Sequence, residues 1–219
     1  MDIGDIRTYS GDKLAVVRKR GDSVNGWDLS LGNMLNGWPL EVGGRTFRSL
    51  ETAYIAGVFS GSGDAEHVRA QEAVRAEGNG FMAKRRFRDG RGNHEWVLPL
   101  QRTDFNDPWH LDWMCWLWWR KVSQHPDFAA KLLAIPDDWA ILEDGRGRDA
   151  RWGCIRQKDG SWTGLNYFGV IAMEVRRALR AGVAPDIDLA ALDAAGMWWF
   201  GVPMRFAGTV EPLAPPAAA

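Results

Sequence analysis

Tryptophan is the residue type that most constrains how this chain can fold. The sequence has 13 Trp among its 219 residues, and five of them occur between positions 109 and 119. These five are Trp109, Trp113, Trp116, Trp118 and Trp119. The first three are spaced by four and three residues, which places them on one face of a helix and favours burial in the core. The other two lie off that face, which indicates burial on a second side or a partner surface.

Capping residues, glycines and prolines divide the rest of the chain into short elements. Ser49 and Asp64 are suitable N-caps for helices over 50–59 and 65–77. Gly43-Gly44 is a turn that can join two strands of a hairpin. Further helices are predicted at 81–88, 108–124, 126–135, 163–180 and 188–195, and strands at 14–17 and 139–143. The pattern predicts an α+β fold, a single domain that is mainly helical around a small sheet or hairpin.

Composition excludes several classes of protein. Hydrophobic residues make up 46% and charged residues 25% of the chain, which is typical of soluble globular domains. The net charge of -1 argues against a generally basic nucleic-acid coat. No signal peptide and no apolar run of ~18 residues occurs, so we expect a cytoplasmic protein without a membrane span.

The reactive residue types point away from metal and cofactor chemistry. Two cysteines, Cys115 and Cys154, are too few for a disulfide scaffold or a four-cysteine zinc site. The four histidines are scattered without metal-ligand spacing. No P-loop, dinucleotide glycine fingerprint, HExxH motif or nucleophile elbow is present. A mechanism based on carboxylates remains, and we expect no cofactor and no metal.

An ordered set of short motifs resembles the NADAR / YbiA-like family. The set comprises Leu31-Gly32-Asn33-Met34, Trp38 to Phe47, Ser49-Leu50-Glu51, Gln124 to Phe128, Ile141-Leu142-Glu143, Asp149-Ala150-Arg151-Trp152-Gly153, Asn166-Tyr167-Phe168-Gly169 and Met173-Glu174-Val175-Arg176. Together these motifs span roughly residues 28–180. The most specific parts are Asp-x-x-Trp-Gly and Asn-x-x-Gly. The resemblance implies a YbiA-like fold and hydrolysis of an N-glycosidic bond in a ribosyl phosphate or an ADP-ribosyl compound.

The resemblance also implies two catalytic carboxylates, Glu51 and Asp149. An oxocarbenium-like transition state needs a nearby negative charge, and a second group must place water or protonate the leaving base. Each residue has a structural alternative. Glu51 lies in the first helical turn, where the helix dipole favours a carboxylate in any case. Asp149 lies in an arginine-rich loop and has several cationic neighbours to pair with.

Six further residues are candidates for binding the substrate. Trp152 and the adjacent Gly153 match the family's pocket motif, and Asn33 and Asn166 match family positions that suit hydrogen bonds to a ribose or a base. Their alternatives are a core position for the indole, and turn or helix-start roles for the amides. Arg85 and Arg88 lie in the basic run 84–91. Helical i, i+3 spacing would place both on one side for phosphate binding, the alternative being a solvated face.

The helix after Glu51 departs from the family pattern. The family carries a His directly after the acidic residue and then a Gln and a Lys. Here these places hold Thr52, Ile55 or Gly57, and Val58. The loss of three polar groups leaves a second hypothesis open, a non-catalytic module that binds ADP-ribose or a related nucleotide. A third is an antitoxin-type enzyme that removes ADP-ribose from a nucleic-acid base, with the 84–91 run touching the nucleic acid.

The predicted organisation has three parts. Residues 1–27 form an N-terminal β extension, and residues 28–180 form the family-like domain with an irregular insertion at 89–107. Residues 181–219 form a C-terminal extension that ends in a mobile tail rich in Ala and Pro. The insertion and the extension lie outside the resemblance and are candidates for a lid or a partner surface.

Overall fold

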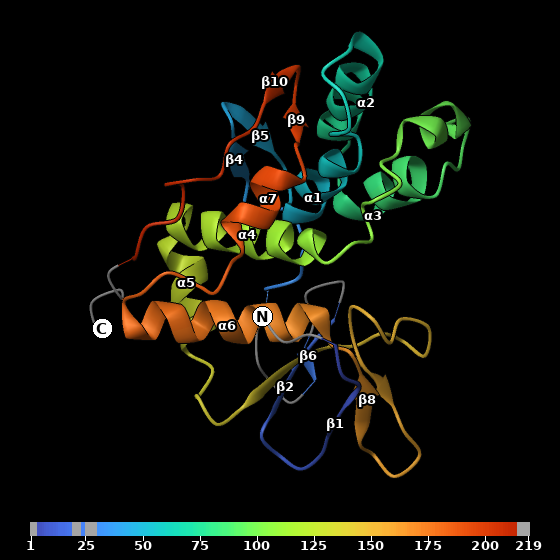
Figure 1. Ribbon diagram of the computed structural model, residues 1–219. Helices are drawn as coiled ribbons and strands as arrows, with labels where there is room; N and C mark the ends of the chain where they lie inside the picture. The colour runs from blue at the N-terminus through green and yellow to red at the C-terminus, as the bar shows by residue number, and fades with distance from the viewer. Residues whose placement is uncertain (1–3, 19–22, 25–29, 214–219) are drawn as a thin grey trace. The chain divides into compact units, whose positions relative to one another are not determined.

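The computed structural model describes residues 4–18, 23–24 and 30–213 (Figure 1). The chain forms two compact units. Unit 1 comprises Met1–Gly32, His125–Asp186 and Pro212–Ala219, and unit 2 comprises Asn33–Gln124 and Ile187–Glu211. Because each unit combines segments that are distant in sequence, they are parts of one domain rather than two consecutive domains. The prediction of a single, mixed helical and strand domain is confirmed. The expected boundary at 27/28 and the tail at 214–219 lie outside the described residues.

Helix α1 (Leu50–Val58) is the central element of unit 2. Ser49 is its N-cap as predicted, and Thr52 completes a capping box, because each side chain bonds the other residue's backbone N–H. All nine residues of α1 are buried. The helix packs against α2 (Ala65–Ala76), α3 (Gly80–Ala83) and α4 (Trp109–Gln124), so it has no face toward solvent.

The tryptophan-rich helix α4 is buried as predicted. Trp113 and Trp116 stack with ring centroids 5.3 Å apart, and Phe206 meets both rings edge-on. Trp118 and Trp119 are buried too, which confirms burial on a second side. The segment after α7 (Leu189–Ala194) provides part of this cover, because the indole Nε1 of Trp119 donates to the carbonyl of Glu211.

Two hairpins complete unit 2, and they lie side by side (Figure 1). The predicted hairpin consists of β4 (Leu40–Val42) and β5 (Arg45–Phe47), joined by two glycines with positive φ. The second consists of β9 (Trp198–Trp199) and β10 (Val202–Pro203) and was not predicted. Trp199 links the two, since its Nε1 donates to the carbonyl of Val42 at 3.0 Å.

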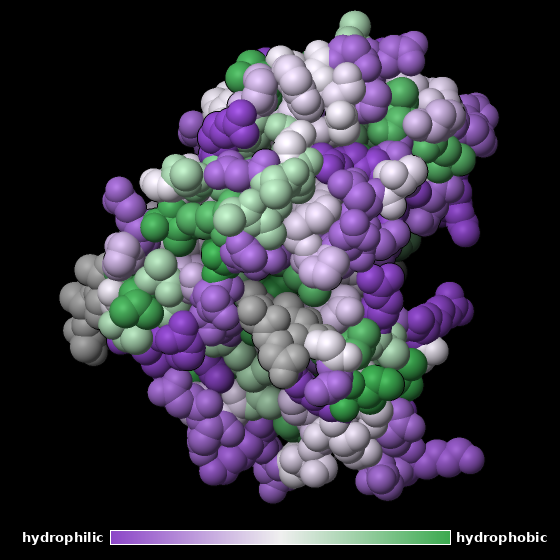
Figure 2. All heavy atoms as spheres, viewed as in Figure 1, coloured by the Kyte–Doolittle hydropathy of each residue, from purple (hydrophilic) through white to green (hydrophobic). Residues whose placement is uncertain are grey.

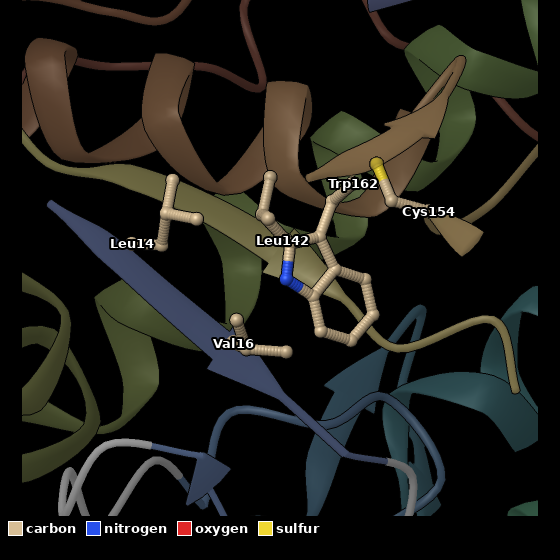
Figure 3. Close-up of a cluster of buried hydrophobic side chains, with 5 residues drawn as sticks. All are labelled: Leu14, Val16, Leu142, Cys154 and Trp162. Atoms are coloured by element: carbon tan, nitrogen blue, oxygen red, sulfur yellow. The ribbon is translucent and has the colours of Figure 1, made fainter. Parts of the chain in front are cut away.

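Unit 1 contains two small sheets. In one, β2 (Leu14–Val17) pairs in parallel with β6 (Ala140–Glu143) and antiparallel with β3 (Ser23–Val24). In the other, β8 (Trp162–Gly164) lies between β1 (Arg7–Tyr9) and β7 (Ile155–Arg156). Leu14, Val16, Leu142, Cys154 and Trp162 form a buried cluster between these strands (Figure 3). Both predicted strands, at 14–17 and 139–143, are thereby confirmed.

Helix α6 (Tyr167–Ala181) packs on β6 and on α5 (Pro126–Leu133). The predicted start of this helix at residue 163 is wrong. Residues 162–164 form β8 instead, because they pair with β1 from the beginning of the chain. Among the described residues, no helix has the length and apolar character needed to cross a membrane.

Candidate functional site

Glu51 is a buried carboxylate in the first turn of α1. Only 8% of the residue is exposed, and its backbone N–H donates to the carbonyl of Asn33 at 2.9 Å. The capping box at Ser49 and Thr52 fixes the start of the helix and therefore the place of Glu51. The helix dipole stabilises a negative charge at this position.

Asn33 lies directly beside Glu51 and carries an unsatisfied polar atom. Its side chain is buried, and its Nδ2 contacts Sδ of Met114 at 3.6 Å. Its Oδ1 is buried and has no hydrogen-bond partner among the described residues. Leaving such an acceptor unpaired is costly, so a buried amide oxygen without a partner is a candidate for ligand binding.

Gly80 supports this corner of unit 2 and was not predicted as a site residue. A Cβ at position 80 would lie 2.7 Å from Cβ of Glu51, 2.9 Å from Cα of Met34 and 3.0 Å from Oγ of Ser49. Only glycine allows α3 to begin so close to Glu51. The sequence Gly78-Asn79-Gly80 predicts the end of a helix, and it gives no indication that Gly80 packs closely against Glu51.

Arg85 and Arg88 lie on η1 (Lys84–Arg88), which is a π-helix rather than an α-helix. The wider turn is closed by a bond from the Asp89 N–H to the Lys84 carbonyl, so residues three apart are no longer one turn apart. The expected α-helical alignment of the two arginines is therefore wrong. Arg85 is exposed, whereas Arg88 donates to Asn106 at 3.2 Å and lies over the ring of Phe105.

The insertion at 89–107 is not wholly irregular, since it includes the 3-10 helix η2 (Glu95–Leu100). In Figure 2 the surface over α2, η1 and η2 is mostly hydrophilic, with a few apolar side chains between. The exposed apolar residues here include Trp96 and Leu98 on η2 and Phe81 on the neighbouring α3.

Asp149 and Trp152 belong to one tight loop of unit 1. Oδ1 of Asp149 accepts a hydrogen bond from the backbone N–H of Trp152 at 3.0 Å, which closes a turn. The indole of Trp152 is half-buried and meets the ring of Tyr167 edge-on at 5.7 Å. Gly153 is required here because a Cβ would lie 2.4 Å from the carbonyl oxygen of Glu143.

Asn166 is fully engaged by the scaffold. Its Nδ2 donates to the carbonyl of Ile141 at 2.9 Å and contacts the Tyr9 hydroxyl at 3.2 Å, and its Oδ1 accepts from the N–H of Glu143 at 3.3 Å. Gly169 lets α6 approach β6, since a Cβ there would meet the Ile141 carbonyl at 1.9 Å. These contacts favour the structural alternative for the Asn-x-x-Gly motif.

The places on α1 where the family pattern has polar residues are all buried. Thr52 uses its hydroxyl within the capping box, and Ile55 and Val58 lie in the core. Gly57 has its Cα against the indole of Trp113. The three positions that carry polar side chains in the family pattern therefore make contacts within the core of this protein.

Two buried ionisable residues were not singled out from the sequence. Lys121 on α4 is completely buried, and burial lowers the pKa of its ammonium group to about 7. Glu143 at the end of β6 is also buried. Apolar residues precede each of them, Trp118 and Trp119 before Lys121 and Ile141 and Leu142 before Glu143, so each reads in the sequence as the polar edge of an apolar element.

The candidate residues fall into two groups. Unit 2 brings together Glu51 and Asn33, and it also carries the two arginines of η1. Unit 1 brings together Asp149, Trp152, Gly153 and Asn166, which are connected through the N-terminus of α6. The predicted pair of carboxylates takes one member from each unit, and its convergence stays a prediction.

Comparison with protein-family models gives no match, and neither does comparison with curated proteins. Among solved structures, the chain is similar to the NMR structure of the E. coli protein YbiA, with a TM-score of 0.52 and 22% sequence identity. The similarity covers 79% of this chain and 89% of YbiA. The protein therefore has a fold similar to that of YbiA.

Proposed function

We propose that the protein hydrolyses the N-glycosidic bond of a ribosyl phosphate or an ADP-ribosyl compound. The observation that carries this proposal is the unsatisfied Oδ1 of Asn33 beside the buried Glu51. The YbiA-like fold and the ordered sequence motifs support the same reaction class.

In the proposed reaction, the bond between C1′ of the ribose and the base nitrogen breaks, and water supplies the new oxygen on C1′. The carboxylate of Glu51 stabilises the positive charge that develops on the sugar ring. Oδ1 of Asn33 accepts a hydrogen bond from a ribose hydroxyl, which satisfies the buried acceptor. A second group places the water or protonates the leaving base, and the sequence motifs nominate Asp149 for this role.

Substitution of Glu51 by Gln tests the proposal. Wild-type protein is incubated with a panel of ribosyl phosphates, ADP-ribosyl compounds and an ADP-ribosylated oligonucleotide, and release of free base is measured by chromatography. We expect Glu51→Gln to lower release by at least ~100-fold. Glu66→Gln is the matched control, because Glu66 is an exposed carboxylate in the first turn of α2. Equal activity of Glu51→Gln and wild type would contradict the proposal.

A second candidate function is binding of ADP-ribose without turnover. The burial of Thr52, Ile55, Gly57 and Val58 in the core favours it, because these places supply no polar group to a substrate. In that case wild type binds ADP-ribose and releases no base from any member of the panel, and Glu51→Gln leaves catalysis at the same zero level. The panel therefore separates the two functions.

A further inference from the structure

Three arginines extend from one short loop of unit 1, between β6 and β7. Arg146, Arg148 and Arg151 are all exposed, and none of them forms an ion pair with another described residue. The guanidinium of Arg151 lies 5.9 Å from the centre of the Tyr167 ring. Three positive charges are thus available within six residues.

The loop is held by its own backbone. The N–H groups of Arg148 and Asp149 both donate to the carbonyl of Gly145, at 3.0 and 3.1 Å, and Gly145 donates to Cys154 at 2.8 Å. The Asp149 carboxylate closes the following turn through the Trp152 N–H. Because the backbone is fixed, binding a ligand here costs little ordering of the loop.

The other side of the loop is anchored to the start of α6. The carbonyls of Ala150, Arg151 and Trp152 accept hydrogen bonds from the N–H groups of Leu165, Tyr167 and Phe168, at 2.7, 3.0 and 3.0 Å. The last two of these bonds satisfy the first two N–H groups of α6, those of Tyr167 and Phe168. The helix N-terminus is therefore occupied, and the arginine side chains are the groups of this loop that remain for an anion.

Arg146 occupies a backbone conformation that favours glycine. Its φ is 51°, and the next residue, Gly147, has a φ of 71°, so the pair forms the centre of a mirror-image turn. Glycine would adopt this conformation without strain, whereas arginine does so at a cost.

We propose that this loop, residues 145–152, binds the phosphate groups of a nucleoside diphosphate. Guanidinium groups bind phosphate oxygens through two parallel hydrogen bonds, and three of them match the charge of a diphosphate. Asp149 is a positioning residue for this site because it holds the turn between Arg148 and Arg151.

The basic run of unit 2 is less suited to this role. Arg86 is paired with Glu77 at 2.7 Å, and Arg88 is bonded to Asn106. Arg85 is exposed and its role in phosphate binding stays a prediction, whereas the side chains of Arg86 and Arg88 are already engaged.

Binding of inorganic pyrophosphate, ADP and adenosine to the full chain, measured by calorimetry, tests the assignment. The variant Arg146→Gly keeps the left-handed backbone and removes the side chain, so its Tm should equal or exceed that of wild type. We expect it to bind pyrophosphate and ADP on the order of tenfold more weakly, because a charge-assisted hydrogen bond is lost. Adenosine, which has no phosphate, should bind both proteins alike.

Arg156→Gln is the matched control, because Arg156 is an exposed arginine on β7 outside the loop. The assignment is overturned if Arg146→Gly binds both phosphate probes like wild type, if Arg156→Gln loses as much affinity, or if wild type binds neither probe. This outcome is distinguishable from failure of the proposed hydrolase. If phosphate binding depends on Arg146 but no base is released, the phosphate site stands and the hydrolase proposal fails. If base release depends on Glu51 but Arg146→Gly binds the phosphate probes like wild type, the hydrolase proposal stands and the phosphate site fails.

Discussion

Substitution of Gly57 by Ala should destabilise the protein, although the same change stabilises most helices. Alanine in a helix interior is favoured over glycine by about 0.5–1 kcal/mol. Here a Cβ on residue 57 would lie 2.5 Å from Nε1 of Trp113, and 3.1 and 3.3 Å from two further ring atoms. An ordinary contact begins at 3.4 Å, so the Nε1 atom of the indole would have to move about 0.9 Å away from the new Cβ.

The indole of Trp113 has no room for such a movement. It is completely buried and stacked on Trp116, and it meets Trp199 and Phe206 edge-on with ring centroids 5.5 and 6.0 Å away. Overpacking of a core of this kind costs about 1–3 kcal/mol. After the gain in helix propensity is subtracted, the free energy of unfolding should fall by about 1 kcal/mol. The same substitution in an isolated helix would stabilise it by about as much.

Urea denaturation followed by circular dichroism measures the difference as a shift of the midpoint at constant m-value. Gly78→Ala is the control, because no described residue other than its chain neighbours lies within 4 Å of a Cβ at that position, and it should change stability by less than about 0.5 kcal/mol. The double variant with Trp113→Phe should recover part of the loss, since the two residues are in contact. A Gly57→Ala protein more stable than wild type would refute the packing argument.

Two further substitutions probe buried cations. Burial lowers the pKa of Lys121 to about 7, whereas the unfolded chain has about 10.4, so the unfolded state binds more protons between these values. The free energy of unfolding is measured by urea melts from about pH 7 to 8.5 for wild type and for Lys121→Met. The wild-type value should rise relative to that of the variant by up to about 1.4 kcal/mol per pH unit. If the two free energies change with pH in parallel, the buried lysine does not titrate as expected. Arg176 donates to the carbonyls of Ile135, Pro136, Asp137 and Trp139 at 2.8–3.4 Å. Arg176→Lys should lower the stability measured by thermal melting by about 2 kcal/mol, because an ammonium group cannot span these acceptors, while Arg177→Lys at an exposed ion pair should have little effect.

Local signals in the sequence predicted the elements whose stability is local. Ser49 and Asp64 cap α1 and α2 as expected, because a cap depends only on the three residues that follow it. The Gly43-Gly44 turn was predicted for the same reason. The sequence predicts helix from residue 163 where the structure has the strand 162–164, because the partner strand β1 lies at the start of the chain and no local pattern reveals such pairing. The π-helix at 84–88 was also missed, because its sequence suits an α-helix equally well.

The sequence predicts which residue types could form the candidate site, but it does not reveal which of them have hydrogen-bond partners in the folded protein. Asn33 and Asn166 look alike in sequence, since each is an amide with a turn or helix-start role as its structural alternative. The structure separates them by their partners: the side chain of Asn166 bonds three groups of the scaffold, whereas Oδ1 of Asn33 bonds none of the described residues. A buried amide that is satisfied by backbone contributes to folding, and one that is not satisfied is kept at a cost.

The same reasoning applies to charge. The densest basic run, at 84–91, is the feature that sequence inspection favours for phosphate binding, yet two of its arginines already have partners. The three arginines of the 145–152 loop are fewer and interrupted by acidic and small residues, but their backbone is fixed and their side chains have no ion-pair partner among the described residues. The net binding free energy is reduced when a cation must break an existing ion pair or lose backbone freedom to bind the ligand. An exposed guanidinium without an ion-pair partner on an ordered loop has the smallest loss of both kinds. Free charge on a fixed backbone is therefore a better guide to an anion site than the number of cations in a run.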